Sequence, residues 1–78
     1  MPDLEPSSLE IAIRHVGQGR RIVARQRRLI ETLAGNGCDT SNAERTFDLF
    51  VTTLRIFEEH LRYLQENAWL RAVGCAPG

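Results

Sequence analysis

The stretch AGNGCDTSNAE, residues Ala34 to Glu44, separates two long segments in which apolar residues recur at helical spacing. Glycine takes the left-handed backbone conformation that ends many helices, so either Gly35 or Gly37 is expected to end the first helix. Short connections join helices that are antiparallel neighbours. The sequence therefore predicts an all-α fold, an antiparallel two-helix hairpin.

Both predicted helices begin at residue types that cap a helix. Before the second helix these are Asp39, Thr40 and Ser41. Ser41 followed by Glu44 fits a capping box, and Thr40 is the rival cap. Before the first helix, Ser7 or Ser8 is available, and Glu10 follows closely to complement the helix dipole.

The chain of 78 residues is long enough for one domain. We expect an extended lead over residues 1–8 and helices over about 9–34 and 41–73. The turn is expected over about 35–40 and a C-terminal tail over 74–78. Chains this short bury a modest fraction of their surface and usually need a staple, a metal or a partner chain.

The second segment has the stronger apolar pattern. Its apolar residues alternate in steps of three and four: Phe47, Phe50, Leu54, Phe57, Leu61, Leu64 and Ala68. This spacing predicts a coiled-coil-like seam. In the first segment, the two seam positions hold Leu9, Val16, Val23 and Ile30, and Ala12, Gly19, Gln26 and Leu33. We expect Ile13, Ile22 and Leu29 to broaden this stripe.

Three seam or near-seam residues leave alternatives open. Gly17 and Gly19 each cost about 1 kcal/mol relative to alanine inside a helix. Either the helix continues through them and they allow close approach of a neighbour, which we favour, or the helix breaks and residues 9–16 form a separate helix. Gln26 either sets register or oligomeric state, or turns its amide to the edge.

A second apolar stripe lies on the second helix, away from the seam. It consists of Leu49, Ile56, Tyr63 and Leu70, each seven residues apart, with Val51 and Trp69 nearby. One antiparallel partner cannot cover both stripes, and a large exposed apolar patch usually marks an interface. We therefore predict a homodimer in which two hairpins form a four-helix bundle. The alternative is that the N-terminal segment folds back over the stripe.

Arginine supplies all ten basic residues, and five of them lie in GQGRRIVARQRR, residues Gly17 to Arg28. The helical spacing places four arginines on the outward surface: Arg14, Arg21, Arg25 and Arg28. We expect this surface to be solvated and partly neutralised by the second helix. The hairpin would bring Arg20 and Arg21 near Glu58 and Glu59, and Arg27 near Asp48.

The alternative is that these four outward arginines bind phosphates or an acidic partner. The net charge is zero, and the aromatic residues lie on the other helix, whereas nucleic-acid binders usually have a basic excess with aromatic side chains among the charges.

The polar residues do not form a recognisable catalytic set. His15 and His60 would lie across the hairpin from each other, near Glu59, but no pair of ligand residues at metal-binding spacing supports a metal site. Cys38 and Cys75 would lie at opposite ends of the hairpin, too far apart for a disulfide. We expect no catalytic residue, no metal and no cofactor, and thus not an enzyme.

We expect neither a secretory signal nor a membrane-spanning segment in this sequence. Its first residues are acidic rather than basic, and no apolar run approaches the roughly 20 residues needed to cross a bilayer. We expect a cytoplasmic protein without a membrane partner.

From Arg21 onward the chain resembles a group of small, uncharacterised bacterial helical-hairpin proteins. The resemblance rests on RIVARQRRLIETL (residues 21–33), GCDTSNAE (37–44) and HLRYL (60–64). It implies a helical protein with no established activity and no catalytic residue. Taken with the two stripes, it favours a small non-enzymatic protein–protein interaction or oligomerisation module. The alternative is a nucleic-acid-associated regulator that uses the arginines of the first helix.

Overall fold

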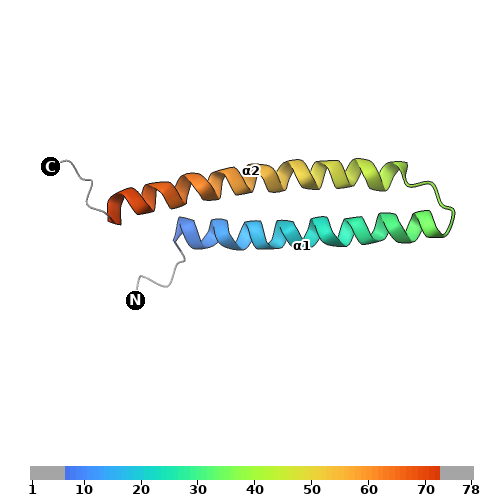
Figure 1. Ribbon diagram of the computed structural model, residues 1–78, viewed down its shortest axis with the longest axis horizontal. Helices are drawn as coiled ribbons and strands as arrows, with labels where there is room; N and C mark the ends of the chain where they lie inside the picture. The colour runs from blue at the N-terminus through green and yellow to red at the C-terminus, as the bar shows by residue number, and fades with distance from the viewer. Residues whose placement is uncertain (1–6, 73–78) are drawn as a thin grey trace.

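The computed structural model describes residues 7–72, which form two antiparallel α-helices joined by a short turn (Figure 1). Helix α1 spans Ser8–Gly35 and helix α2 spans Ser41–Ala72. The predicted all-α hairpin is confirmed, and the described residues contain no strand. Most of the expected N-terminal lead, Val73 and the expected C-terminal tail lie outside the described residues.

A capping box holds the start of α1. Ser7 is the N-cap: its Oγ accepts a hydrogen bond from the backbone N–H of Glu10 at 3.1 Å. In return, Glu10 Oε1 accepts from the backbone N–H of Ser7 at 2.9 Å. Two amide groups that would otherwise lack partners at the helix start are thereby satisfied.

The end of α1 is a Schellman turn built on Gly37 rather than Gly35. Gly37 has a φ of 74°, in the left-handed region, and its N–H donates to the carbonyl of Ala34 at 3.1 Å. The N–H of Cys38 donates to the carbonyl of Leu33 at 2.9 Å. These two bonds reverse the chain and direct it toward the start of α2.

The start of α2 depends on Asp39 and Thr40. Asp39 Oδ1 accepts from the backbone N–H of Ser41 at 2.9 Å and from its hydroxyl at 2.7 Å. These hydrogen bonds lower the pKa of the Asp39 carboxyl from its ordinary value of 3.8. Thr40 donates its hydroxyl to the Glu44 carboxylate. Ser41 is the first helical residue, so the capping box predicted for Ser41 and Glu44 is wrong.

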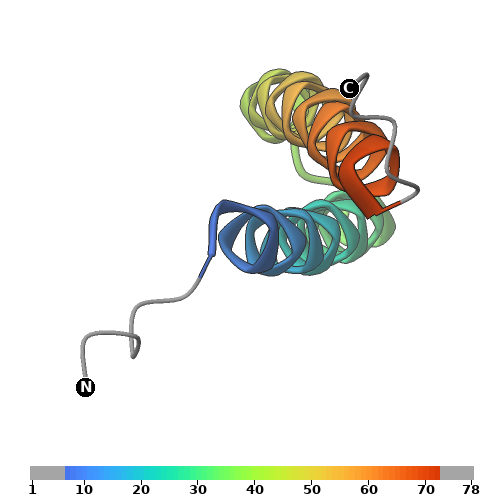
Figure 2. The same cartoon turned by 90° about the vertical axis from the view of Figure 1, so that its left-hand side faces the viewer.

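The predicted seam forms the contact between the helices. Among the described residues only Ala12 and Val16 are buried, at 5% and 3% exposure. The remaining predicted core residues are half-buried: Val23, Ile30, Leu33, Phe47, Phe50, Leu54, Phe57, Leu61 and Leu64. Seen along the helices, the hairpin is a single layer, so each helix is covered on one side (Figure 2).

The seam ends before Ala68, which is exposed. Helix α2 extends past the start of α1 (Figure 1). Ser7 and Ser8 line the same pocket as Asn67 and Ala68, so Trp69 and Leu70 lie beyond the start of α1. The prediction of Ala68 as a seam residue therefore continued one turn too far.

Helix α1 is continuous through Gly17 and Gly19, as favoured from the sequence. A Cβ added at Gly19 would lie 3.1 Å from Leu54 Cδ1, so this glycine allows the close approach of α2. Farther along, Gln26 Nε2 donates to the backbone carbonyl of Ala43 at 3.0 Å. Gln26 thus joins the two helices across the seam and helps to set their register.

Candidate interaction surfaces

The two long edges of the hairpin differ in chemistry, and one of them is polar. Arg20 Nη2 lies 3.3 Å from Glu58 Oε2, and Arg20 Nε donates to the same oxygen at 3.4 Å. Next along this edge, the Arg27 guanidinium lies over the ring of Phe47, 5.6 Å from its centroid. The Arg20–Glu58 pair is confirmed, whereas Arg27 contacts Phe47 rather than the predicted Asp48.

The opposite edge contains both histidines. The ring centroids of His15 and Phe57 lie 5.4 Å apart. His15 and His60 line one open pocket of about 210 Å³ with Ser8, Ile11 and Ala12. Among residues 7–72, no group of three or more His, Cys, Asp or Glu side chains is close enough to hold a metal ion. One hairpin thus offers two ligand side chains, fewer than the three or four protein ligands that zinc sites use.

Exposed apolar side chains from both helices extend along this histidine edge. Ile22 and Leu29 follow His15 in steps of seven, which places them on its side of α1. On α2, Ile56 lies four residues before His60 and Tyr63 three residues after it, so they are neighbours of His60 on the helix surface.

We call this set the apolar face and define it by its members: Ile11, Ile22, Leu29, Leu49, Ile56, Tyr63 and Leu70. Leu49, Ile56 and Tyr63 are the most exposed of them, at 67%, 58% and 62%. No part of residues 7–72 covers the face. The alternative in which the N-terminal segment folds back over the stripe of α2 involves residues 1–6, which lie outside the described range.

The contribution of α1 to this face was missed from the sequence. Ile13, Ile22 and Leu29 were expected to broaden the seam, but all three are exposed. Ile13 lies on the other edge, seven residues before Arg20. The heptad positions in the sequence do distinguish these residues. Ile22 and Leu29 share a heptad position with His15, while Ile13 shares one with Arg20 and Arg27.

The four arginines predicted to face outward are all exposed: Arg14, Arg21, Arg25 and Arg28. None of them forms an ion pair with an acidic residue of the described range, so the expected pairing of Arg21 with Glu58 or Glu59 is wrong. Among residues 7–72, Arg20 is the arginine of α1 that forms an ion pair with α2. We call these four residues the arginine face; it is a run of positive charge on the surface of α1.

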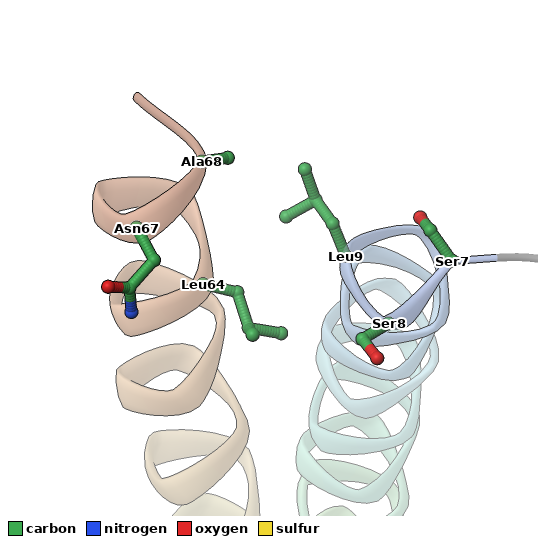
Figure 3. Close-up of a pocket in the computed structure, with 6 residues that line it drawn as sticks. All are labelled: Ser7, Ser8, Leu9, Leu64, Asn67 and Ala68. Atoms are coloured by element: carbon green, nitrogen blue, oxygen red, sulfur yellow. The ribbon is translucent and has the colours of Figure 1, made fainter. Parts of the chain in front are cut away.

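A second open pocket, of about 420 Å³, lies at the end of the hairpin away from the turn. Leu9 and Leu64 point toward each other across it (Figure 3). The amide of Asn67, also in its lining, already donates to the carbonyl of Tyr63 at 2.9 Å. The pocket is an open hollow between the start of α1 and the C-terminal part of α2, and we assign it no chemistry.

Cys38 is an exposed free thiol in the turn, and no histidine shares that end of the hairpin. Cys75 lies outside the described residues. Across residues 7–72, no helix is long and apolar enough to cross a membrane.

No protein family, curated protein or solved structure matches this chain. The resemblance to bacterial helical-hairpin proteins and the expected cytoplasmic location therefore stay predictions. The apolar face and the arginine face are the two surfaces of the hairpin that bear on its function.

Proposed function

We propose that this protein is a non-enzymatic interaction module that functions as a homodimer, in which two hairpins form a four-helix bundle. The observation that supports this most directly is the apolar face. Seven large apolar side chains along one edge are exposed in the single hairpin, and exposed apolar patches on this scale usually mark interfaces.

The weak core of the single hairpin supports the same proposal. Only Ala12 and Val16 are buried among the described residues, so one hairpin removes little apolar surface from water. Fully burying a leucine-sized side chain yields about 1.5–3 kcal/mol. The residues of the apolar face are about half exposed, so covering each side chain completely would yield about 1 kcal/mol. Summed over the apolar faces of two copies, this free energy is comparable with the cost of association.

Light scattering coupled to size exclusion tests the dimer at micromolar concentration. We expect twice the chain mass of 8.8 kDa. Ile56→Asp places a charge in the apolar face and should give a monomer that keeps its helical circular dichroism. Ile13→Asp is the matched control, because Ile13 is similarly exposed but lies on the other edge. A monomeric wild-type chain would refute the proposal.

A second candidate function, as a nucleic-acid-associated regulator, is favoured by the arginine face. Its four guanidinium groups are exposed and free of ion pairs within the described residues. Proteins that neutralise phosphates release counterions, so log affinity should fall linearly with log salt in a gel-shift titration. The triple variant Arg21→Glu, Arg25→Glu, Arg28→Glu should abolish that shift. Absence of a shift for the wild type at low salt would eliminate this candidate.

A further inference from the structure

We infer that the second copy packs on the apolar face with its turn at the same end of the bundle, so that α1 of each copy lies against α2 of the other. The inference rests on the proposed dimer and specifies its geometry. A two-fold axis in the interface can run along the helices or across them. Along the helices, the turns meet and α1 contacts α2. Across them, the turns are at opposite ends and like helices pair.

The composition of the apolar face requires the partner to cover both helices. Ile22 and Leu29 on α1 are 40% and 45% exposed, and Leu49 and Ile56 lie on α2 along the same edge. Contact through α2 alone would leave the α1 residues in water. Each helix therefore acquires a second neighbour, and the two symmetric arrangements differ in which helix that neighbour is.

Charge distinguishes the two arrangements. Helix α1 has six arginines and two glutamates, whereas α2 has four arginines and five acidic residues. Pairing α1 with α1 would place two strongly positive helices together, while pairing α1 with α2 joins a positive helix to a slightly negative one. Two unit charges 4 Å apart interact by about 1 kcal/mol in water and more near a protein surface.

The charges that border the apolar face make this difference local. Arg25 lies three residues after Ile22, so the arginine face runs along the α1 border of the apolar face. Glu59 lies three residues after Ile56, at the equivalent border of α2. With like helices paired, each α1 border would meet the other α1 border, arginine against arginine.

The register within the hairpin shows which charges would meet. Gly19 lies beside Leu54, and Arg20 pairs with Glu58, so Arg14 comes level with the segment 59–64. When both turns lie at the same end of the bundle, each residue of the second copy lies at the same height along the helices as its counterpart in the first copy. Arg14 then lies opposite Glu59 of the partner subunit and Arg28 lies level with Arg45 of the partner subunit, so one opposite-charge pair and one like-charge pair recur on each side of the two-fold axis, whereas pairing α1 with α1 sets arginine against arginine at Arg14, Arg21 and Arg28.

Cys38 in the turn provides the test. In a Cys75→Ser background, which leaves Cys38 as the sole thiol, a spin label on Cys38 reports the distance between the two turns. Helices in bundles pack 8–10 Å apart, so we expect about 20 Å or less between the labels. With turns at opposite ends, the labels would be about 45 Å apart, the length of about 30 helical residues.

A long distance in a dimeric sample would overturn the orientation and leave the proposed dimer intact. A monomeric mass would refute the dimer itself, so the two failures are distinguishable. A charge exchange provides a second measurement. Arg14→Glu and Glu59→Arg should each weaken the dimer about two- to fivefold, and the double variant should restore it. No restoration would contradict the α1-to-α2 contact.

Discussion

Gly17 and Gly19 are two glycines in one helix, and only Gly19 lies against α2. At Gly17, the nearest atom to an added Cβ is Arg21 Nη1 at 3.7 Å, which is ordinary contact. At Gly19, Leu54 Cδ1 would be 3.1 Å away and would have to move. Gly17 therefore lowers the stability of α1 without a packing reason in the hairpin, whereas at Gly19 the close approach of Leu54 leaves little room for a side chain.

This difference predicts different effects of the same substitution. Gly17→Ala should stabilise the protein by about 1 kcal/mol, the difference in helix propensity between the two residues. Gly19→Ala gains the same propensity but crowds Leu54, so its net gain should be smaller or negative. Urea unfolding of both variants measures the difference. An equal or larger gain at Gly19 would contradict the assignment of Gly19 as a contact residue.

Asp39 predicts a pH dependence at the start of α2. Its pKa is lowered from 3.8, first by the hydrogen bond from the Ser41 backbone N–H and then by the Ser41 hydroxyl. Because the folded state holds the charged form, its stabilisation is complete above the unfolded pKa and is lost as pH falls through the lower folded pKa.

The expected result is a wild-type thermal midpoint above that of Asp39→Asn at neutral pH, with a gap that narrows below the ordinary pKa of 3.8. Other carboxyl groups titrate in both proteins, so the comparison isolates this residue. A gap that stays constant on acidification would show that the carboxylate charge is not involved.

At the scale of the helices, adjacent residues on α2 have separate roles. Phe57 is half-buried in the seam and lies against His15, whereas Ile56 is 58% exposed on the apolar face. Phe57→Ala should destabilise the isolated hairpin by about 2 kcal/mol, below the roughly 3–5 kcal/mol typical of this change in a protein core, because Phe57 is incompletely buried. Ile56→Ala should cost the isolated hairpin about 0.5 kcal/mol or less.

Urea unfolding at the lowest measurable protein concentration, where the monomer is favoured, compares the two variants. In an assay of dimer dissociation, Ile56→Ala should have the larger effect, because Ile56 faces the proposed partner and Phe57 faces α1. Equal costs for both variants in the monomer would show that the seam and the apolar face are not separate surfaces.

At the scale of the whole molecule, folding and association should be linked. The single hairpin is one layer with two buried residues in its described range, so binding of the proposed second copy to the folded state would supply part of the stability (Figure 2). The thermal midpoint should therefore rise with protein concentration. Ile56→Asp should abolish this dependence and Ile13→Asp should retain it. A midpoint independent of concentration in the wild type would indicate a hairpin that is stable alone.

Much of the hairpin could be predicted because its signals are local. The N-cap serine of α1, the left-handed glycine after α1 and the apolar spacing of α2 depend on residues within one or two turns of each other. Within the α2 N-terminus, three competent caps in a row left the choice open. In the structure, Asp39 Oδ1 accepts a hydrogen bond from the backbone N–H of Ser41, and Ser41 is the first helical residue.

The pairing of arginines with acids could not be predicted because it depends on side-chain direction. Residue levels across the hairpin placed Arg20, Arg21 and Arg27 near acidic residues, but only Arg20 forms an ion pair with one of them in residues 7–72. Arg21 is one position farther round the helix, which turns it away from α2. Arg27 lies on the correct edge, and its guanidinium rests on the Phe47 ring instead.

The sequence by itself determined the two helices and most residues of the seam, because caps and periodic apolar residues act through neighbours along the chain. The tertiary structure alone showed that Gly19 accommodates Leu54, that Gln26 binds the carbonyl of Ala43, and that Ile22 and Leu29 share an edge with the second stripe of α2. These contacts depend on the register and the rotation of one helix against the other. Contacts between residues that are far apart in the chain determine this register and rotation.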